Sequence, residues 1–317
     1  MKAAIIDRYG PPEVFQVKDM PKPEIGDNEI LVKVKAVAIT AADSRVRGAR
    51  FPKGFGLISR VVFGFTKPRI KVLGNTYSGI VEEAGKNVTE FKVGDEVCGM
   101  TGGKMGTYAE LIKIRKFHSI AKKPAEVSHE DAAGMLFGGT AALYFLREKI
   151  GIKKGETAVI NGASGAVGTN AVQLARYFGA KVIGVTSGDN AKLIKSLGAE
   201  DIIDYTKQNL SDSGRKFDVI LDTVGNISPE IAKTLLTKKG RAGLMVAGLD
   251  VILKSRGPIK TGVATEKKED IELLIGLVGQ NRLKVVIDKT YPLQDIAKAH
   301  AHVDGGKKVG NVIVRIG

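Results

Sequence analysis

The sequence predicts an α/β protein in which a doubly wound parallel sheet is joined to a second, smaller and mainly β domain. Three observations support this prediction. A glycine-rich turn follows a short apolar run in the middle of the chain. Strand-like and helix-like segments then alternate, which is typical of parallel βαβ units. The N-terminal third instead contains short β-like runs separated by Gly, Pro, Asp and Asn.

The glycine-rich turn has the features of a phosphate-binding loop. Residues 158–160 form a short apolar strand, and the apolar residues from Val167 to Ala175 recur at roughly helical spacing. Gly165 would let a diphosphate approach the backbone, and Gly168 would let the helix pack closely on the strand. Ala163 occupies the position of the usual first glycine. Taken alone, the pattern equally fits a tight turn that binds nothing.

The segments after the turn favour nucleotide binding over a tight turn that binds nothing. Further strands are predicted at 180–185, 201–204, 217–222 and 242–246. A helix from Asn190 to Leu197 separates the first two and stops at Gly198, as a helix commonly does before glycine. This alternation predicts a doubly wound sheet, in which a turn of this kind binds a dinucleotide.

Outside this region the pattern changes. β-like runs at 29–38, 78–82 and 93–97 predict a compact, mainly β domain. Ser128 and Asp131 have the spacing of a capping box before a helix over 132–149. The C-terminal part predicts, in order, a helix at 268–279, a strand at 284–287, a helix at 293–303 and a strand at 311–316.

Composition sets further limits. The chain has 317 residues, 43% of them hydrophobic, which suggests about two domains with substantial cores. The single cysteine, Cys98, cannot form a disulfide within the chain, which fits a reducing compartment. We see neither a secretory signal nor an apolar run of the roughly 20 residues that span a membrane. We therefore expect a cytoplasmic protein.

Positive charge is the most unusual compositional feature. Lys and Arg number 49 against 34 Asp and Glu, a formal net charge of +15 that favours anionic ligands or surfaces. The excess is most concentrated from Arg45 to Lys71, a stretch without an acidic residue and with interleaved phenylalanines. A solvated face over a partly apolar lobe is the commoner explanation of such a stretch. Contact with nucleic acid or a membrane surface is the less common alternative, and the sequence does not exclude it.

Several motifs follow one another in a recognisable order along nearly the whole chain. They are Asp95-Glu-Val97, Gly106-Thr-Tyr-Ala-Glu110, Gly138-Gly-Thr-Ala-Ala142, Gly162-Ala-Ser-Gly-Ala-Val-Gly168, Leu197-Gly-Ala199, Ile203-Asp-Tyr205, Tyr291-Pro-Leu293 and Gly310-Asn-Val312. In this order they resemble the medium-chain dehydrogenase/reductase superfamily, in its zinc-independent quinone oxidoreductase branch. The resemblance implies a GroES-like domain over residues 1–122, a Rossmann domain over 123–286 and a return over 287–317 that completes the first domain. It also implies hydride transfer between NADPH and a quinone or an α,β-unsaturated carbonyl.

The sequence predicts no metal site. Catalytic zinc needs about three converging Cys, His or acidic ligands, and structural zinc commonly needs four cysteines. Where zinc-dependent relatives have their first cysteine ligand, this chain reads Ala38-Ile-Thr-Ala-Ala-Asp43, and where they have Gly-His-Glu it reads Gly74-Asn-Thr76. Surface or packing roles are expected for the histidines His118, His129, His300 and His302, the last two of which point to different faces of a predicted helix.

The choice of cofactor depends on the end of the second strand. An NAD enzyme usually has an acid there, whereas Thr186 and Ser187 resemble the 2′-phosphate pocket of NADP-dependent relatives. Tyr205 matches a residue that often stacks near that phosphate. Asp189, where relatives often have Lys or Arg, would repel the phosphate if it faced inward and would be harmless if exposed. The comparison favours NADPH and leaves NADH as the alternative.

The resemblance also assigns cofactor contacts, each with ordinary packing or capping as the alternative. The pyrophosphate is assigned to the glycine turn, the adenosine to the ends of the second and third strands, and the nicotinamide to scattered segments. The residues assigned to the pyrophosphate are Gly162, Ala163, Ser164, Gly165, Ala166, Val167 and Gly168. Those assigned to the adenosine are Ser187 and Tyr205, and those assigned to the nicotinamide are Thr140, Val246, Ala247 and Asn311.

Catalytic residues are less evident. Thr40 replaces an asparagine common in relatives, and Tyr77 lies beside the former metal position, so both are candidates to bind or protonate a carbonyl oxygen. The alternative is pocket lining for these two, with a salt bridge from Asp43 to a nearby arginine.

The sequence therefore supports one main hypothesis, a zinc-independent NADPH-dependent reductase of a quinone or enone. Its ligand site would be a cleft between the two domains, and a homodimer through the edge strands of the Rossmann sheet is common among relatives. Two alternatives stay open. One is an enoyl-thioester reductase, and the other is a cofactor-binding protein whose main role is association with RNA, an anionic membrane or another protein.

Overall fold

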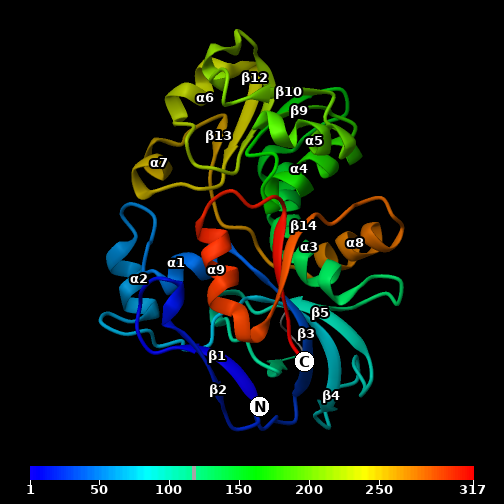
Figure 1. Cartoon of the computed structure of the whole chain (residues 1–317). Helices are drawn as coiled ribbons and strands as arrows, with labels where there is room; N and C mark the ends of the chain where they lie inside the picture. The colour runs from blue at the N-terminus through cyan, green and yellow to red at the C-terminus, as the bar shows by residue number, and fades with distance from the viewer. Residues whose placement is uncertain (116–118) are drawn as a thin grey trace. The chain divides into compact units, whose positions relative to one another are not determined.

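Residues 138–265 build a sheet of six parallel strands (Figure 1). The computed structural model of the chain describes residues 1–115 and 119–317. The order across the sheet is β10-β9-β8-β11-β12-β13, so the chain runs from β8 toward one edge and later from β11 toward the other. This reversal makes the sheet doubly wound, as predicted. The strands are β8 (Thr157–Asn161), β9 (Lys181–Thr186), β10 (Asp201–Asp204), β11 (Phe217–Asp222), β12 (Leu236–Leu244) and β13 (Ile259–Lys260).

Helices connect these parallel strands. They are α4 (Ala166–Tyr177), α5 (Ala191–Ser196), α6 (Pro229–Leu235) and α7 (Leu249–Lys254), with 3₁₀ turns at Gly188–Asn190 and Leu210–Ser213. Helix α3 (His129–Leu143) and its π-helical continuation (Tyr144–Ile150) precede β8. The predicted capping box starts α3, because the Asp131 amide donates to Ser128 Oγ at 3.0 Å and that hydroxyl donates to the Asp131 carboxylate at 2.8 Å.

A second sheet, mostly antiparallel, contains strands from both ends of the chain. Its order is β14-β15-β3-β4-β5-β7, and β6 also pairs with β3; β1 and β2 form a separate ribbon. Strand β15 pairs with β3, Val312 opposite Ile39, so the C-terminal strands complete a sheet begun near the N-terminus. The strands are β1 (Lys2–Ile6), β2 (Phe15–Asp19), β3 (Glu29–Ile39), β4 (Thr76–Ala84), β5 (Glu96–Met100), β6 (Leu111–Arg115), β7 (Ile120–Lys122), β14 (Ile287–Pro292) and β15 (Asn311–Arg315).

Two predicted strands start later than expected. The run at 93–97 opens with a turn, in which Gly94 has a φ of +91° and the Lys92 amide donates to the Asp95 carboxylate at 3.0 Å, so β5 starts at Glu96. The strand predicted at 284–287 begins only at Ile287. Alternation of apolar residues predicts a strand but does not reveal where its backbone pairing begins.

Four α-helices accompany the second sheet: α1 (Ala41–Arg47), α2 (Gly56–Phe63), α8 (Lys268–Gly279) and α9 (Ile296–Asp304). Helical 3₁₀ turns occur at Pro12–Val14, Gly102–Lys104 and Leu293–Asp295. Helices α8 and α9 fall in the predicted segments. Helices α1 and α2 were not predicted, and they lie in the basic stretch between Arg45 and Lys71 or directly before it.

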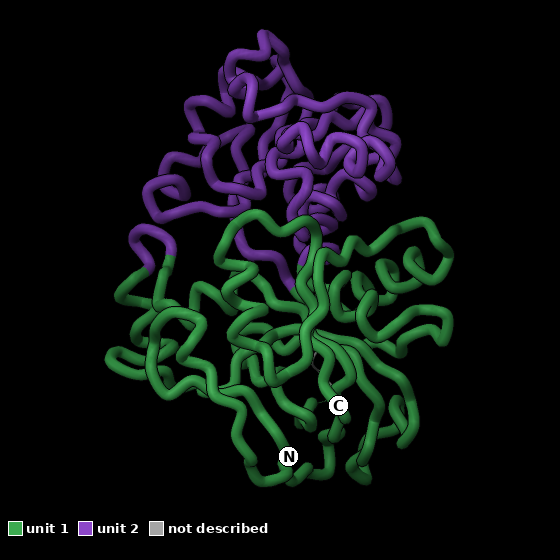
Figure 2. Tube along the Cα trace, in the orientation of Figure 1, with its two compact units in different colours: residues 1–51, 56–137, 266–317 green, residues 52–55, 138–265 purple. Residues whose placement is uncertain are grey.

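The chain divides into two compact units (Figure 2). The first comprises residues 1–51, 56–137 and 266–317, and the second comprises residues 52–55 and 138–265. The domain boundaries expected at 122 and 286 remain predictions, and these units divide the chain differently. Helix α8 belongs to the first unit because it packs on β7, and Lys268 forms a 3.0 Å ion pair with Glu90. The first turns of α3 belong there too, where Glu130 pairs with Arg315 at 2.6 Å.

Each unit has its own apolar core. Buried side chains of the first include Ile6, Ile30, Leu73, Ile114 and Val312. Those of the second include Val159, Ile183, Phe217, Ile220 and Leu244. Cys98 is buried and has a free thiol. In the ranges 1–115 and 119–317 no helix combines the length and apolar character needed to cross a bilayer.

The capping box of α3 gives a test of the first unit. Replacing Ser128 by Ala removes the acceptor of the Asp131 amide and should lower the free energy of unfolding by about 1 kcal/mol, measured by urea denaturation. The matched control is Ser196→Ala, whose hydroxyl only donates to the Leu193 carbonyl at the end of α5 and should change stability by a few tenths of a kcal/mol. Equal effects of the two substitutions would contradict the assigned cap.

Candidate functional site

The turn between β8 and α4 is shaped by two glycines that cannot be replaced. Gly162 has a φ of +79°, and a Cβ there would lie 2.6 Å from Thr223 Oγ1. A Cβ at Gly168 would clash with the carbonyl oxygen of Gly162 and come within 2.7 Å of the backbone of Ala163. Gly168 therefore serves the close approach of the helix to the strand, the role predicted for it, whereas Gly162 leaves room for the side chains of Thr223 and Val224.

Gly165 differs from both. It is the N-cap of α4, its backbone is extended (φ −75°, ψ 173°), and the nearest atom to a Cβ there would be 3.5 Å away. No side chain caps the helix at this residue, and the first amide that bonds back along the helix is that of Thr169, to the Gly165 carbonyl at 2.9 Å. The preceding amides, at 166–168, have no carbonyl acceptor within the helix.

The turn thus separates into packed and open positions. Ala163 is fully buried, donates its amide to the Val185 carbonyl at 3.0 Å and faces β9. The partly exposed positions are Gly162, Ser164, Gly165, Ala166 and Val167. These open positions surround the free helix amides, where an anion is most stable. The open positions of the turn therefore fit the diphosphate of a dinucleotide. The buried residues Ala163 and Gly168 pack the turn against the rest of the second unit.

A buried acid that sequence reasoning missed holds the neighbouring loop. Asp222, at the end of β11, accepts hydrogen bonds from the amides of Val224 at 3.0 Å, Gly225 at 3.1 Å and Ile227 at 3.2 Å. It also accepts from Asn161 Nδ2 at 2.9 Å, across the two central strands. These donors compensate the charge of a side chain with no solvent exposure. Loop 223–227 is thereby fixed beside Gly162, at the point where the strand order reverses.

The two residues assigned to the adenosine are brought together. Thr186 pairs with Asp204 in the parallel β9–β10 ladder, so Ser187 and Tyr205 follow the carboxyl ends of adjacent strands. Ser187 Oγ accepts from Asn190 Nδ2 at 3.1 Å, and the ring of Tyr205 is 59% exposed. Asp189 is exposed, which is the harmless placement considered above.

The residues assigned to the nicotinamide are more scattered. Val246 lies against Gly225 of loop 223–227, where an added Cβ would be 2.9 Å away, and Ala247 follows it partly exposed. Thr140 is buried on α3. Asn311 belongs to the first unit and donates its amide and its Nδ2 to the Val286 carbonyl, at 2.8 and 3.0 Å. Its side chain therefore links β15 to the segment before β14.

Thr40 lies at the start of α1 as its N-cap. Its hydroxyl accepts from the Asp43 amide at 3.3 Å and donates to the Asp43 carboxylate at 2.7 Å. Asp43 also accepts from the Gly74 amide at 3.2 Å, which ties α1 to the segment before β4. Burial raises the pKa of Asp43 from its ordinary value of 3.8 to about 6, against the opposing effect of these hydrogen bonds.

The alternative considered for Asp43, a salt bridge to a nearby arginine, is not found among the described residues. The nearby Arg47 is buried and pairs instead with Asp304 of α9, while its Nε donates to the Gly10 carbonyl at 3.2 Å. Helix geometry explains this result, because Asp43 turns back to cap the helix at Thr40 whereas Arg47 extends from the last turn.

Tyr77 is fully buried in the core of the first unit. Its hydroxyl lies against Gly99, where an added Cβ would be 2.7 Å away, and among the described residues it has no hydrogen-bond partner. Burial raises the pKa of the phenol well above its ordinary value. This placement supports the packing alternative for Tyr77 over the role of proton donor.

The described histidines are engaged in local contacts. His129 Nδ1 lies 2.7 Å from Ser78 Oγ, and burial lowers its pKa. His300 is buried against Phe15, whereas His302 on the opposite face contacts Asp288 at 2.5 Å. His118 lies outside the described residues. Within 1–115 and 119–317 no three His, Cys, Asp or Glu side chains gather as a metal site would require.

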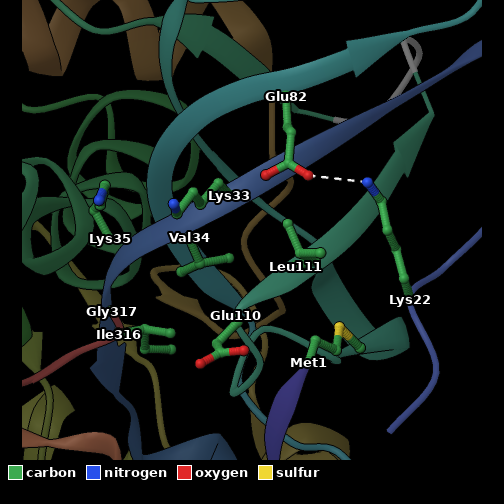
Figure 3. A pocket seen from close by; sticks show the side chains of 10 residues that line it. All are labelled: Met1, Lys22, Lys33, Val34, Lys35, Glu82, Glu110, Leu111, Ile316 and Gly317. Atoms are coloured by element: carbon green, nitrogen blue, oxygen red, sulfur yellow. Dashed lines mark hydrogen bonds and ion pairs between the residues drawn. The ribbon is translucent and has the colours of Figure 1, made fainter.

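The first unit contains a cavity of about 450 Å³ beside β3 (Figure 3). Charges of both signs line it, and Lys22 forms a 3.0 Å ion pair with Glu82. None of the residues assigned to the cofactor or to catalysis contributes to its lining, which includes Lys22, Lys33, Val34, Lys35, Glu82 and Glu110. The cavity is therefore separate from the nucleotide-binding turn.

Comparison with known proteins agrees with this architecture. Residues 26–149 match the family model described as the alcohol dehydrogenase GroES-like domain, and residues 197–314 match the one described as zinc-binding dehydrogenase. The quinone oxidoreductase of Pseudomonas aeruginosa is 29% identical over 96% of this chain and 97% of its own. The acryloyl-coenzyme A reductase of Sulfurisphaera tokodaii is 29% identical over 99% of this chain and all of its own.

A solved structure extends the likeness to three dimensions. The Escherichia coli quinone oxidoreductase complexed with NADPH superposes with a TM-score of 0.83 at 26% identity, covering 99% of this chain and 100% of that one. The chain belongs to the medium-chain dehydrogenase/reductase superfamily of oxidoreductases, in its quinone oxidoreductase-like branch. The predicted fold class, a Rossmann sheet joined to a GroES-like mainly β domain, is confirmed.

The glycines of the turn can be distinguished by substitution. Gly165→Ala should leave the melting temperature nearly unchanged, because its Cβ fits, yet should weaken nucleotide binding by crowding the diphosphate. Gly168→Ala should lower the free energy of unfolding by about 2 kcal/mol, because its Cβ has no space. Thermal melts and a nucleotide titration separate the two effects. A Gly165→Ala variant that binds nucleotide like the wild type would contradict the proposed diphosphate site at this turn.

The buried Asp43 predicts a pH dependence of stability. Because its pKa is raised in the folded state, the native protein holds the proton between about pH 4 and pH 6 while the unfolded chain has lost it. Its contribution, on the order of 2 to 3 kcal/mol, is present below about pH 4 and is lost as the pH rises through about 6. Urea melts of Asp43→Asn should lack this decline, whereas Thr40→Ser, which keeps the hydroxyl, should retain it. An unchanged pH profile in Asp43→Asn would refute the assignment.

Proposed function

We propose that the chain is a zinc-independent, NADPH-dependent reductase that transfers hydride to a small-molecule quinone or α,β-unsaturated carbonyl. The observation that carries the proposal is the β8–α4 turn, where open backbone at Gly165 meets the free amides of α4 beside the reversal of strand order. Such a turn fits an anion such as the diphosphate of a dinucleotide. The names of the Pseudomonas and Escherichia relatives support a quinone as the oxidant.

Different residues of the second unit would bind different parts of the dinucleotide. The amides at 166–168 would hold the diphosphate, and Asp222 would keep loop 223–227 in place beside it. Ser187 and Tyr205 would border the adenosine, which supports NADPH, as does the NADPH bound to the Escherichia relative. Asp189 is exposed and does not oppose a 2′-phosphate from inside the fold. NADH remains the less favoured alternative.

When bound, a reduced nicotinamide supplies a hydride, and the chain has to stabilise the charge that develops on the substrate oxygen. We assign the stabilisation of this charge to Thr40 and Asp43, which share a hydrogen bond and can supply a proton. Below about pH 6 Asp43 carries a proton, and Thr40 Oγ lies 2.7 Å from its carboxylate. Tyr77, buried in the core, is left with a packing role in this proposal.

The side chains that are present support independence from zinc. The described histidines are held by Ser78, Phe15 and Asp288, and the thiol of Cys98 is buried with a pKa raised to about 12. Zinc needs deprotonated thiolates or free imidazoles that converge. Cytoplasmic localisation and a homodimer through the sheet edges complete the proposal. Nucleic acid is not part of it.

An enoyl-thioester reductase is the second candidate. The acryloyl-coenzyme A reductase relative favours it, at the same identity as the quinone oxidoreductase relative and over a comparable length. The two reactions share the hydride transfer and differ in the substrate. Comparing turnover of an acyl thioester with that of the matching free enone would separate them.

The proposal predicts saturable NADPH oxidation in the presence of a small quinone or enone, unaffected by a metal chelator. Ser187→Ala and Tyr205→Ala should raise the KM for NADPH about tenfold, with little change in that for NADH, because both residues border the 2′-phosphate position. Lys238→Ala, an exposed residue elsewhere in the second unit, is the control. Absence of NADPH and NADH binding in a fluorescence titration would refute the proposed function, and inhibition by the chelator would refute its independence from zinc.

A further inference from the structure

Helix α2 exposes an apolar face. A surface helix normally turns its apolar side chains toward the core and its polar ones toward water. In α2 the arrangement is reversed, because the exposed fractions are 70% for Leu57, 60% for Ile58, 51% for Val61 and 56% for Val62. These four positions, at i, i+1, i+4 and i+5, share one side of the helix. Phe65, 54% exposed, continues the patch just beyond it.

The opposite side of α2 is anchored to the first unit. Phe63 stacks on Phe51 with ring centroids 5.8 Å apart, and the Tyr9 hydroxyl donates to the carbonyls of Phe63 and Gly64 at 2.8 and 2.9 Å. The Arg60 guanidinium lies 5.1 Å from the centre of the Tyr9 ring. The helix is therefore held by its C-terminal turn, and it lies at the margin of the first unit (Figure 1).

The exposed charges that directly follow this patch in the chain are positive. No acidic residue occurs from Arg45 to Lys71. Four basic residues of this stretch form ion pairs with acids from other segments: Arg47 and Arg50 with Asp304, Lys53 with Asp250 and Lys71 with Asp7. Lys67 and Arg69, which follow the helix, are both exposed. A partner for this face has to present apolar material and negative charge together.

Two other occupants fit these observations less well. In a two-fold dimer through this face, the same patch would meet itself and bring two basic rims together. Nucleic acid offers the negative charge, but single-stranded bases stack on aromatic rings, whereas four of the five exposed apolar side chains here are aliphatic. Exposed aliphatic side chains beside exposed cations, here Lys67 and Arg69, are typical of helices that lie in the interface of an anionic bilayer.

We propose that α2 and the residues up to Arg69 form a docking surface for an anionic lipid bilayer. Leu57, Ile58, Val61 and Val62 enter the boundary between head groups and acyl chains, while Lys67 and Arg69 lie among the anionic head groups. The short helix gives a weak, reversible and salt-sensitive association. This surface is distinct from the nucleotide-binding turn and does not depend on the proposed reductase activity.

The test is cosedimentation of the full chain with vesicles of phosphatidylcholine alone and of phosphatidylcholine mixed with phosphatidylglycerol. We expect binding to the anionic vesicles only, weakened by salt. The double substitution Leu57→Ser with Val61→Ser should reduce the partition coefficient about tenfold or more, and Lys67→Glu should reduce it several-fold. The matched controls are Leu253→Ser, a 67% exposed leucine of α7, and Lys238→Glu, an exposed lysine of the second unit. Both should bind like the wild type.

Four outcomes would overturn the proposal. The first is no binding to anionic vesicles at low salt, and the second is an equal loss in Leu253→Ser. The third is a wild-type dimer that becomes a monomer in the double variant, which would identify the patch as an interface between copies. The fourth is unchanged vesicle binding of the double variant with a raised KM for a water-soluble quinone, which would identify a substrate lid. Circular dichroism and NADPH affinity confirm that each variant is folded.

Discussion

The close contact between the backbone of Gly168 and that of Gly162 is the constraint on which the second unit depends. It brings the first turn of α4 against the end of β8, where the amides at 166–168 have no carbonyl acceptor within the helix. A side chain at Gly168 would separate helix and strand and displace these amides. The geometry that packs this sheet is therefore the same geometry that makes an anion site.

Two buried carboxyl groups, those of Asp222 and Asp43, differ in the hydrogen-bond donors that surround them. Asp222 is surrounded by backbone amides and the Asn161 side chain, so its charge holds a loop beside the nucleotide-binding turn. Asp43 has fewer donors for the same degree of burial, and its pKa rises to about 6. The first arrangement orders a loop through hydrogen bonds, whereas the second places a titrating group at the start of α1.

The surface of the first unit adds a separate property. Phe51, Phe63 and Tyr9 hold the C-terminal end of α2 in place, while its aliphatic residues stay exposed among basic side chains. Burying these aliphatic side chains within the chain would have contributed to stability. Their exposure leaves an apolar, cationic face on an oxidoreductase whose relatives include quinone reductases.

The sequence by itself predicted the strands β8 to β12, the glycine turn and the cap at Ser128, because each depends on local periodicity or on a residue that only one backbone geometry accepts. It did not predict β13, α6 or α7. Only the tertiary structure decided the rest. It paired Arg47 with Asp304 instead of Asp43, buried Tyr77, placed Asp222 under a loop and turned the apolar side of α2 outward. Such facts depend on which distant segments meet, and the spacing of residues along a chain does not encode that contact.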